Sequence, residues 1–332
     1  MELELSEIAH TIVDDLIEVE ADEEVFVVCD AEREPIARAV VSAARGADAT
    51  GLLTVAPRVR AYGNEPPATV AEAMRTADVA VTVMNTSLSH TRARRAASDA
   101  GTQTLNLRGV TVDTMLEGGI DTDYAELERR TMLVRDALLA TDAARVTSPT
   151  GTDVTLDIAG RQAYSLDGAY SEAGHEERHI GLPTGEAPTS PTEGTADGTV
   201  VVDHSMDELG LLEAPVEIEI EAGRATEVRG GEDARRLRRL LEEHDGNARN
   251  LAEFAIGTNP DARLTGVLAE DKKVDGTVHF ALGDNLSIGG SVESDLHVDG
   301  MVTRPTVDLD GTRVLHDREI DWDAVRAVAG RE

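Results

Sequence analysis

The sequence is poor in several residue types. Only two of its 332 residues are lysines, Lys272 and Lys273, and the 31 Lys+Arg stand against 64 Asp+Glu, for a formal net charge of −33. Aromatic residues make up 2%, and Cys29 is the one cysteine. A surface this acidic repels phosphate backbones, and no basic stretch is interleaved with aromatics, which excludes a nucleic-acid-binding protein. One cysteine cannot form an internal disulfide, so nothing requires an oxidising compartment.

Long hydrophobic runs are also lacking. No apolar run approaches the ~20 residues that a helix needs to cross a bilayer, and the N-terminus lacks the basic start and apolar stretch of a signal peptide. We therefore expect a cytoplasmic protein with no membrane partner. The acidic residues are spread along the chain, and a hydrophobic content of 41% is enough for a packed core. With so little lysine, this pattern indicates a halophilic protein adapted to molar salt, where the Debye length is only ~3 Å.

Residues 1–145 alternate strand and helix signals. Short apolar runs rich in β-branched residues alternate with segments of helical apolar spacing, which predicts a Rossmann-like domain with a parallel sheet. The turn after the first strand contains no glycine, and the chain has no G-x-G-x-x-G, so no nucleotide site is expected. Strands are predicted at 24–30, 50–56, 78–84 and 102–107, and helices at 31–45, 68–77, 89–101 and 127–140.

Residues 146–332 have a different pattern. Apolar and polar residues alternate at period two, as in half-buried antiparallel strands. The predicted fold class is therefore α/β, with the Rossmann-like domain followed by an α+β, strand-rich domain. Its loop-rich stretch, 164–198, has the length of a functional loop. Strands are predicted at 153–158, 199–203, 215–223, 225–230, 277–283 and 295–300, and a helix at 232–244.

Four residues of the second half have the chemistry of metal ligands. His297 and Asp299 are two apart in a predicted strand and share a face. His279 lies on the small-residue face of another strand, opposite apolar neighbours. Glu253 has apolar residues on both sides, and a buried carboxylate needs a counter-charge, for which a metal is one candidate. Each pattern is common by itself, and Glu186, in G-L-P-T-G-E, reads by itself as a solvated loop residue.

Five blocks in order carry a resemblance. They are GLPTGEAPTSP, PVEIEIEAGRATEVRGGEDA, NLAEFAIGTNP, EDKKVDGTVHFALGDN and SDLHVDG. This set resembles the metallo-aminopeptidases of the aminopeptidase T and aminopeptidase S type, which remove N-terminal residues from peptides. The resemblance implies a catalytic C-terminal domain, a peptide substrate and a homodimer. It also implies two divalent ions, Zn, Co or Mn, bound by Glu186, Glu253, His279, His297 and Asp299.

The residue types suit that chemistry. Two nearby metals can share a water and lower its pKa toward neutrality, which gives a hydroxide nucleophile. Glu186 or Glu253 is the catalytic candidate for shuttling the proton. His175 and His179, in the long loop, and His90, at a helix start, are candidates for contacting the substrate.

The sequence also departs from the family. A tyrosine that the peptidases place near the metals is replaced by Leu286, and the interval between His279 and His297 is short. An alternative is an Fe(II)-dependent dioxygenase that opens the ring of dihydroxypyridine, with His279, His297 and Asp299 as ligands. A further alternative is a non-catalytic relative that binds metal or a peptide. The number and identity of the bound metals would distinguish these functions.

Overall fold

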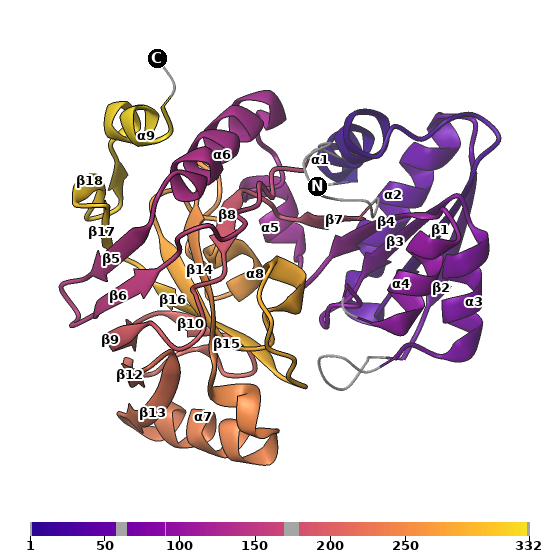
Figure 1. The fold of residues 1–332 in the computed structure, drawn as a ribbon. Coiled ribbons are helices and arrows are strands. Elements are labelled where there is room, and N and C mark those ends of the chain that lie inside the picture. The colour runs from indigo at the N-terminus through magenta and orange to yellow at the C-terminus, as the bar shows by residue number, and fades with distance from the viewer. Residues whose placement is uncertain (1, 58–64, 90, 169–178, 331–332) are drawn as a thin grey trace. The chain divides into compact units, whose positions relative to one another are not determined.

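The structure is a computed structural model that describes residues 2–57, 65–89, 91–168 and 179–330 (Figure 1). It forms two compact units, residues 1–122 with 168–184 and residues 123–167 with 185–332. We expected the boundary near residue 145, which would place helix α6 (Tyr124–Leu139) in the first unit. In the structure α6 belongs to the second unit. The apolar face of α6 packs into the core of the second unit, which explains the difference.

The first unit contains a parallel sheet of five strands in the order β2-β1-β3-β4-β7. This confirms the parallel sheet of the predicted α/β fold class. The last strand, β7 (His179–Leu182), comes from the stretch expected to be a loop and pairs in parallel with β4. The other strands are close to their predicted positions: β1 (Glu24–Cys29), β2 (Thr50–Val55), β3 (Val79–Val83) and β4 (Gln103–Leu107).

Helices pack on the sheet of the first unit because its strands are apolar on both sides. Phe26 of β1 belongs to a core cluster with Met74 and Ala97, from α3 and α4. Cys29 ends β1 and is fully buried. The helices are α1 (Glu2–His10), continued by a π-helical turn at Thr11–Leu16, then α2 (Glu34–Gly46), α3 (Ala68–Thr76), α4 (Arg92–Asp99) and α5 (Val112–Glu117).

The second unit contains two antiparallel sheets (Figure 1). The six-stranded sheet has the order β11-β10-β16-β15-β14-β8, and the eight-stranded sheet has the order β13-β12-β9-β6-β5-β17-β18-β19. The strands of the first are β8 (Glu186–Thr189), β10 (Ser205–Met206), β11 (Gly210–Leu211), β14 (Leu251–Gly257), β15 (Val278–Gly283) and β16 (His297–Val302). Those of the second are β5 (Ala143–Thr147), β6 (Asp153–Asp157), β9 (Asp197–Val202), β12 (Val216–Glu221), β13 (Arg224–Arg229), β17 (Thr306–Leu309), β18 (Thr312–His316) and β19 (Glu319–Ile320).

The core of the second unit joins the two sheets. Phe254 and Phe280 stack with their ring centroids 5.7 Å apart, and both belong to one cluster with Val154 and Val200 of the eight-stranded sheet. The alternate residues of β14, β15 and β16 therefore point away from this core. The helices of the unit are α6, α7 (Glu232–Glu243), the short α8 (Leu268–Asp271) and α9 (Trp322–Val328).

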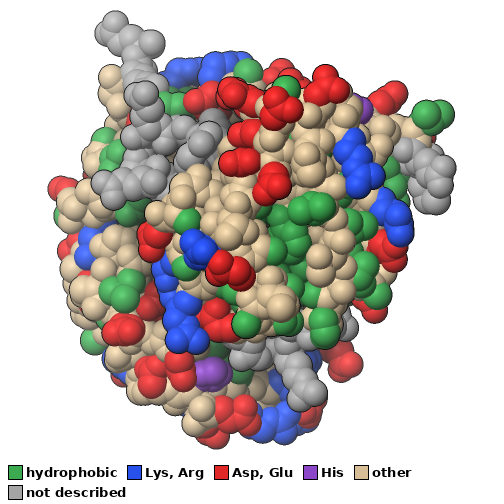
Figure 2. Space-filling model, turned by 90° about the vertical axis from the view of Figure 1, so that its right-hand side faces the viewer, with side chains coloured by type: hydrophobic (Ala, Val, Ile, Leu, Met, Phe, Trp, Pro, Cys, Tyr) green, Lys and Arg blue, Asp and Glu red, His purple; other side chains and the backbone are tan. Residues whose placement is uncertain are grey.

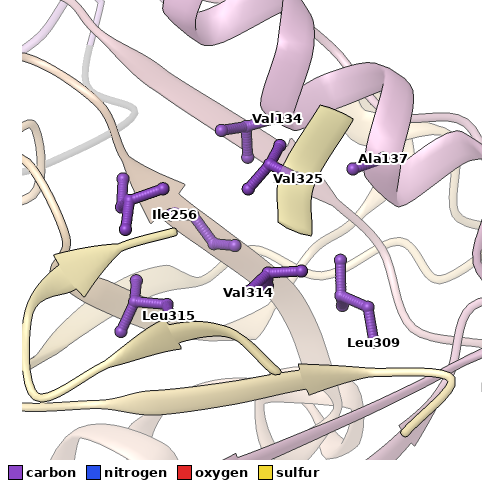
Figure 3. A pocket seen from close by; sticks show the side chains of 8 residues that line it. Val134, Ala137, Ile256, Leu309, Val314, Leu315 and Val325 are labelled. Atoms are coloured by element: carbon purple, nitrogen blue, oxygen red, sulfur yellow. The ribbon is translucent and has the colours of Figure 1, made fainter. Parts of the chain in front are cut away.

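A small apolar gap remains in this core, beneath α6 and α9 (Figure 3). Only aliphatic side chains line it, so it offers no group that would orient a polar ligand, and we regard it as part of the hydrophobic core. The lining residues are Val134, Ala137, Ile256, Leu309, Val314, Leu315, Ile320 and Val325.

The surface reflects the acidic composition. Figure 2 shows Asp and Glu side chains at many places over the face that it draws, and not in a single patch. Some of the exposed carboxylates pair with arginines, as Asp153 does with Arg145 and Asp317 with Arg304. Among the described residues, no helix is both long and apolar enough to cross a membrane.

Candidate metal centre

The candidate site lies on the face of the six-stranded sheet that points away from the core. Ala281 of β15 is paired with Glu253 of β14 on one side and with Asp299 of β16 on the other. Because alanine has a small side chain, it leaves room for the two carboxylates to approach each other above it. His297 shares its face of β16 with Asp299, and His279 shares its face of β15 with Ala281. The predicted face assignments of both histidines are therefore correct.

Three of these residues converge on one point. Within the described ranges, Glu253, His297 and Asp299 form the one group of three or more potential metal ligands whose donor atoms all lie within 4.8 Å of one another. His297 Nε2 is 3.3 Å from Glu253 Oε2 and 3.1 Å from Asp299 Oδ1. Glu253 is 5% exposed and Asp299 is 2% exposed, so bulk water does not solvate their charges.

The other two predicted ligands lie beside this group. His279 Nε2 is 3.1 Å from Glu253 Oε1 and 3.7 Å from Glu186 Oε2. Glu186 begins β8, opposite Gly257 of β14, and is 2% exposed. The structure thus brings all five predicted ligands to one sheet face. It corrects one local expectation, because Glu186 is buried in a strand rather than solvated in a loop.

Sequence reasoning did not name Lys272 and Lys273 as site residues. Both follow α8 and reach the carboxylates, with Lys272 Nζ 2.9 Å from Asp299 Oδ2 and 3.6 Å from Glu186 Oε1. Lys273 Nζ forms an ion pair with the same Glu186 oxygen. The signal that could have identified them was their rarity, since the only two lysines of the chain are adjacent and precede a candidate ligand.

A close backbone approach places the lysine segment. Asn259 N donates to the carbonyl of Lys273 at 2.9 Å, and Gly276 N donates to that of Gly257 at 3.0 Å. A Cβ atom at Gly257 would lie 2.3 Å from the Val274 carbonyl oxygen. Only glycine therefore lets this segment pack so closely against β14.

Neighbouring opposite charges outweigh the effect of burial on the pKa values of Asp299, Glu186 and Lys272. Burial opposes ionisation of Asp299, but Lys272 and His297 outweigh it and hold the pKa of Asp299 well below its usual value. Burial likewise opposes ionisation of Glu186, and the two lysines lower its pKa. Burial lowers the pKa of Lys273 to about 8, assisted by the neighbouring charge of Lys272 and opposed by Glu186. By contrast, Asp299 and Glu186 outweigh burial and raise the pKa of Lys272 well above its usual value.

A second layer of contacts orients His297. Its Nδ1–H donates to the Asp284 carbonyl at 2.8 Å, so Nε2 is the nitrogen that faces the carboxylates. The loop that begins at Asp284 is held by Glu193, whose Oε1 accepts from Asn285 Nδ2 at 3.0 Å and from Ser291 N at 2.8 Å. Backbone and carboxylate partners of this kind fix the ring of a metal-binding histidine.

The donor set fits a cation. His297 Nε2 faces the acceptor oxygens of Glu253 and Asp299. Burial opposes protonation of the ring, but Asp299 and Glu253 outweigh it and raise the pKa of His297 well above its usual value. The nitrogen and these oxygens repel one another unless a proton or a metal lies between them. Glu186 Oε2 is also buried, and among the described residues it accepts no hydrogen bond. This oxygen is therefore a further potential metal ligand. Imidazole and carboxylate ligands suit Zn, Mn and Fe(II).

Of the three predicted substrate contacts, the structure describes one, His179. His179 lies in the first unit, where Nδ1 is 2.8 Å from Thr104 Oγ1 and Nε2 is 2.9 Å from Ser89 Oγ. His90 and His175 lie outside the described residues. Leu286, at the position of the family tyrosine, is 50% exposed and presents no polar group.

Comparison with protein families adds an independent observation. The family model NicX, 2,5-dihydroxypyridine 5,6-dioxygenase, matches residues 10–321. The chain belongs to this family. The structure of 2,5-dihydroxypyridine dioxygenase from Pseudomonas putida KT2440 has the same fold, and the match covers 96% of this chain and 97% of that one. Its TM-score is 0.78 at 20% identity.

The resemblance to aminopeptidase T is also supported. Aminopeptidase T of Thermus thermophilus is 32% identical over 178 residues, which are 48% of this chain and 43% of that protein. The match therefore spans less than half the length of this curated relative. The structure of wild-type AmpT from Thermus thermophilus covers 96% of this NicX-family chain and 99% of its own, with a TM-score of 0.68 at 21% identity.

Proposed function

We propose that this protein is a single-metal enzyme that uses O₂ to open the ring of a dihydroxylated nitrogen heterocycle. The proposal rests on the convergence of Glu253, His297 and Asp299, the donor set for one cation, with His279 adjacent. Non-heme Fe(II) oxygenases use two histidines and a carboxylate on one side of the metal. The converging group contains one histidine and two carboxylates, so His279, whose Nε2 is 3.1 Å from Glu253 Oε1, would supply the second histidine beside His297 and Asp299. The NicX family match over residues 10–321 supports the same reaction class.

The proposed ring opening needs no reagent other than O₂ and the heterocycle. A ring-opening dioxygenation breaks one carbon–carbon bond and adds both atoms of O₂ to the carbons that it joined, so no external reductant is consumed. A bound ferrous ion would supply the one-electron chemistry that lets O₂ react with the ring. Glu253, His297 and Asp299 would hold that ion, and the Asp284 carbonyl would keep the His297 ring in place.

A second candidate is a two-metal aminopeptidase acting on peptides. The retention of Glu186 and His279, which completes the five-residue ligand set of those enzymes, favours it, as does the 32% identity to aminopeptidase T. In that case Glu186 or Glu253 would carry the proton for a metal-activated water. Against it, both lysines already neutralise Glu186, and Leu286 offers no phenol near the metals.

The test is a metal count combined with two activity assays. The protein would be purified without chelator in molar KCl, once anaerobically with Fe(II) and once with Zn, Co or Mn. We expect one metal per chain, and O₂ uptake equal to the loss of 2,5-dihydroxypyridine in the Fe(II) form. Two metals per chain with release of leucine from a leucyl dipeptide, and no O₂ uptake, would refute the proposal in favour of the aminopeptidase. Metal binding with neither reaction would indicate a non-catalytic relative.

A further inference from the structure

We infer that Lys272 and Lys273 take the place of a second divalent cation, so that the site accepts one metal ion. This inference deepens the proposed function and rests on the same site. It concerns the capacity of the site for metal, which can be measured without any assay of turnover.

The contacts show which ligand atoms the lysines occupy. Lys272 Nζ lies between Asp299 Oδ2 at 2.9 Å and Glu186 Oε1 at 3.6 Å, and so bridges strands β16 and β8. Lys273 Nζ pairs with the same Glu186 oxygen. The ammonium groups therefore engage two of the carboxylate oxygens beside the group of Glu253, His297 and Asp299, namely Asp299 Oδ2 and Glu186 Oε1, which a second metal ion would need as ligands.

The charge balance leads to the same conclusion. Three carboxylates, from Glu186, Glu253 and Asp299, give −3, and the two ammonium groups give +2, so the site has a net charge of −1 when its histidines are neutral. One divalent ion changes this to +1, whereas two would give +3 among residues that are almost fully buried. Uncompensated buried charge is strongly unfavourable. Together the two lysines carry the charge of one divalent ion.

The choice of lysine supports a role as a cation substitute. All the other Lys+Arg positions of the chain are arginines. An ammonium group is a compact point charge on a flexible stem, whereas guanidinium is planar and spreads its charge over a rigid fork of donors. Both lysines of the chain thus place their charge at this site, Lys272 between Glu186 and Asp299 and Lys273 against Glu186.

The decisive variant is Lys272→Glu. It removes one ammonium and adds a carboxylate, so the site charge becomes −3, which two divalent ions would change to +1. Wild type and variant would be loaded with Mn²⁺ in molar KCl and examined by elemental analysis and by electron paramagnetic resonance. We expect one Mn²⁺ per chain in the wild type, and two per chain with the spectrum of a coupled pair in the variant. Arg304→Glu, an exposed change in the same unit, makes the same change in net charge and is the control; it should bind one.

Two results would overturn the inference: two Mn²⁺ ions in the wild type, or one in a folded Lys272→Glu protein. If that variant does not fold, Lys272→Gln would be titrated with Mn²⁺ by calorimetry. A second binding event is expected, and a one-site isotherm identical to wild type would overturn the inference. Failure of the proposed function is separable, because one Mn²⁺ per chain without O₂ uptake in the Fe(II) form would contradict the reaction and leave the role of the lysines supported.

Discussion

Replacing Glu193 by glutamine tests how the loop behind the metal centre is held. Glu193 lies outside the ligand set and its side chain is 24% exposed. One of its oxygens accepts from Asn285 Nδ2, from Ser291 N and from Ser291 Oγ, and Arg161 pairs with the carboxylate. Glutamine keeps the size of the side chain but loses the charge that these donors stabilise.

The magnitude follows from the pKa of Glu193. Burial opposes its ionisation, but the hydrogen bonds of Ser291 and Asn285 and the charge of Arg161 outweigh burial and lower the pKa from 4.5 to about 2. At ~1.4 kcal/mol per unit this is worth about 3 kcal/mol, which we reduce to roughly 2 kcal/mol because the group is partly exposed to water. Since the pKa is lower in the folded state, this stability is fully present above about pH 4.5 and is lost as the pH falls through 2.

Urea unfolding in molar KCl would measure the effect. Trp322, the single tryptophan, lies in the second unit, so its fluorescence reports on the unit that contains Glu193. We expect Glu193→Gln to lose roughly 2 kcal/mol of unfolding free energy at pH 7, and the difference from wild type to shrink steadily below pH 4.5. The control is Glu243→Gln, the same change at an exposed position of α7, and it should have no comparable effect.

The same variant should weaken metal binding. Asn285 follows Asp284, whose carbonyl orients His297, so a looser loop lets the imidazole ring move. Loss of such outer contacts typically costs 10- to 100-fold in metal affinity, and we expect about tenfold here. The reasoning would be refuted if Glu193→Gln were as stable as wild type at pH 7, or if its deficit were the same at pH 3 as at pH 7.

Three further predictions address the site and the surface. Glu253→Gln and His297→Ala should each lose bound metal and metal-dependent activity while circular dichroism remains native; full metal content in Glu253→Gln would disprove the ligand assignment. Gly257→Ala should cost about 1–3 kcal/mol, because its Cβ would meet the Val274 carbonyl, whereas Gly246→Ala, where a Cβ meets nothing within 4 Å, should not. The melting temperature should rise between 0.1 M and 3 M KCl, and a fall would contradict adaptation to salt.

Strands with a regular apolar pattern were predictable from the sequence, including the fully buried β3, β4 and β15, and strands without one were not. The strands of the parallel sheet stood out as short apolar runs, and period two placed His297 and Asp299 on one face. Strand β14 was missed because the charged Glu253 interrupts its apolar run, although all seven of its residues are buried. Strands β7 and β8 are only four residues long and lie in a stretch rich in glycine and proline. Their partners are distant in sequence, so pairing rather than local propensity defines them.

The ligands of the site were predictable from the sequence, but the two lysines that balance their charge were not. The resemblance supplied Glu186, Glu253 and His279, residues that no local pattern would have united. It did not supply Lys272 and Lys273, because a ligand motif identifies the residues that bind metal and not those that limit how much metal is bound. Their role became visible only when the fold placed both ammonium groups between carboxylates that are distant in sequence.

Dissolved salt therefore affects the exposed carboxylates of this protein but not the buried ones of the metal centre. Surface carboxylates repel one another across water, and molar KCl screens that repulsion within ~3 Å. Glu186, Glu253 and Asp299 are 5% exposed or less, so mobile ions do not reach them, and only lysine, protonated histidine or a bound metal can balance their charge. Buried pairs are screened much less than exposed ones. Lowering the KCl concentration should therefore destabilise the fold well before it changes the number of metal ions that a folded molecule binds.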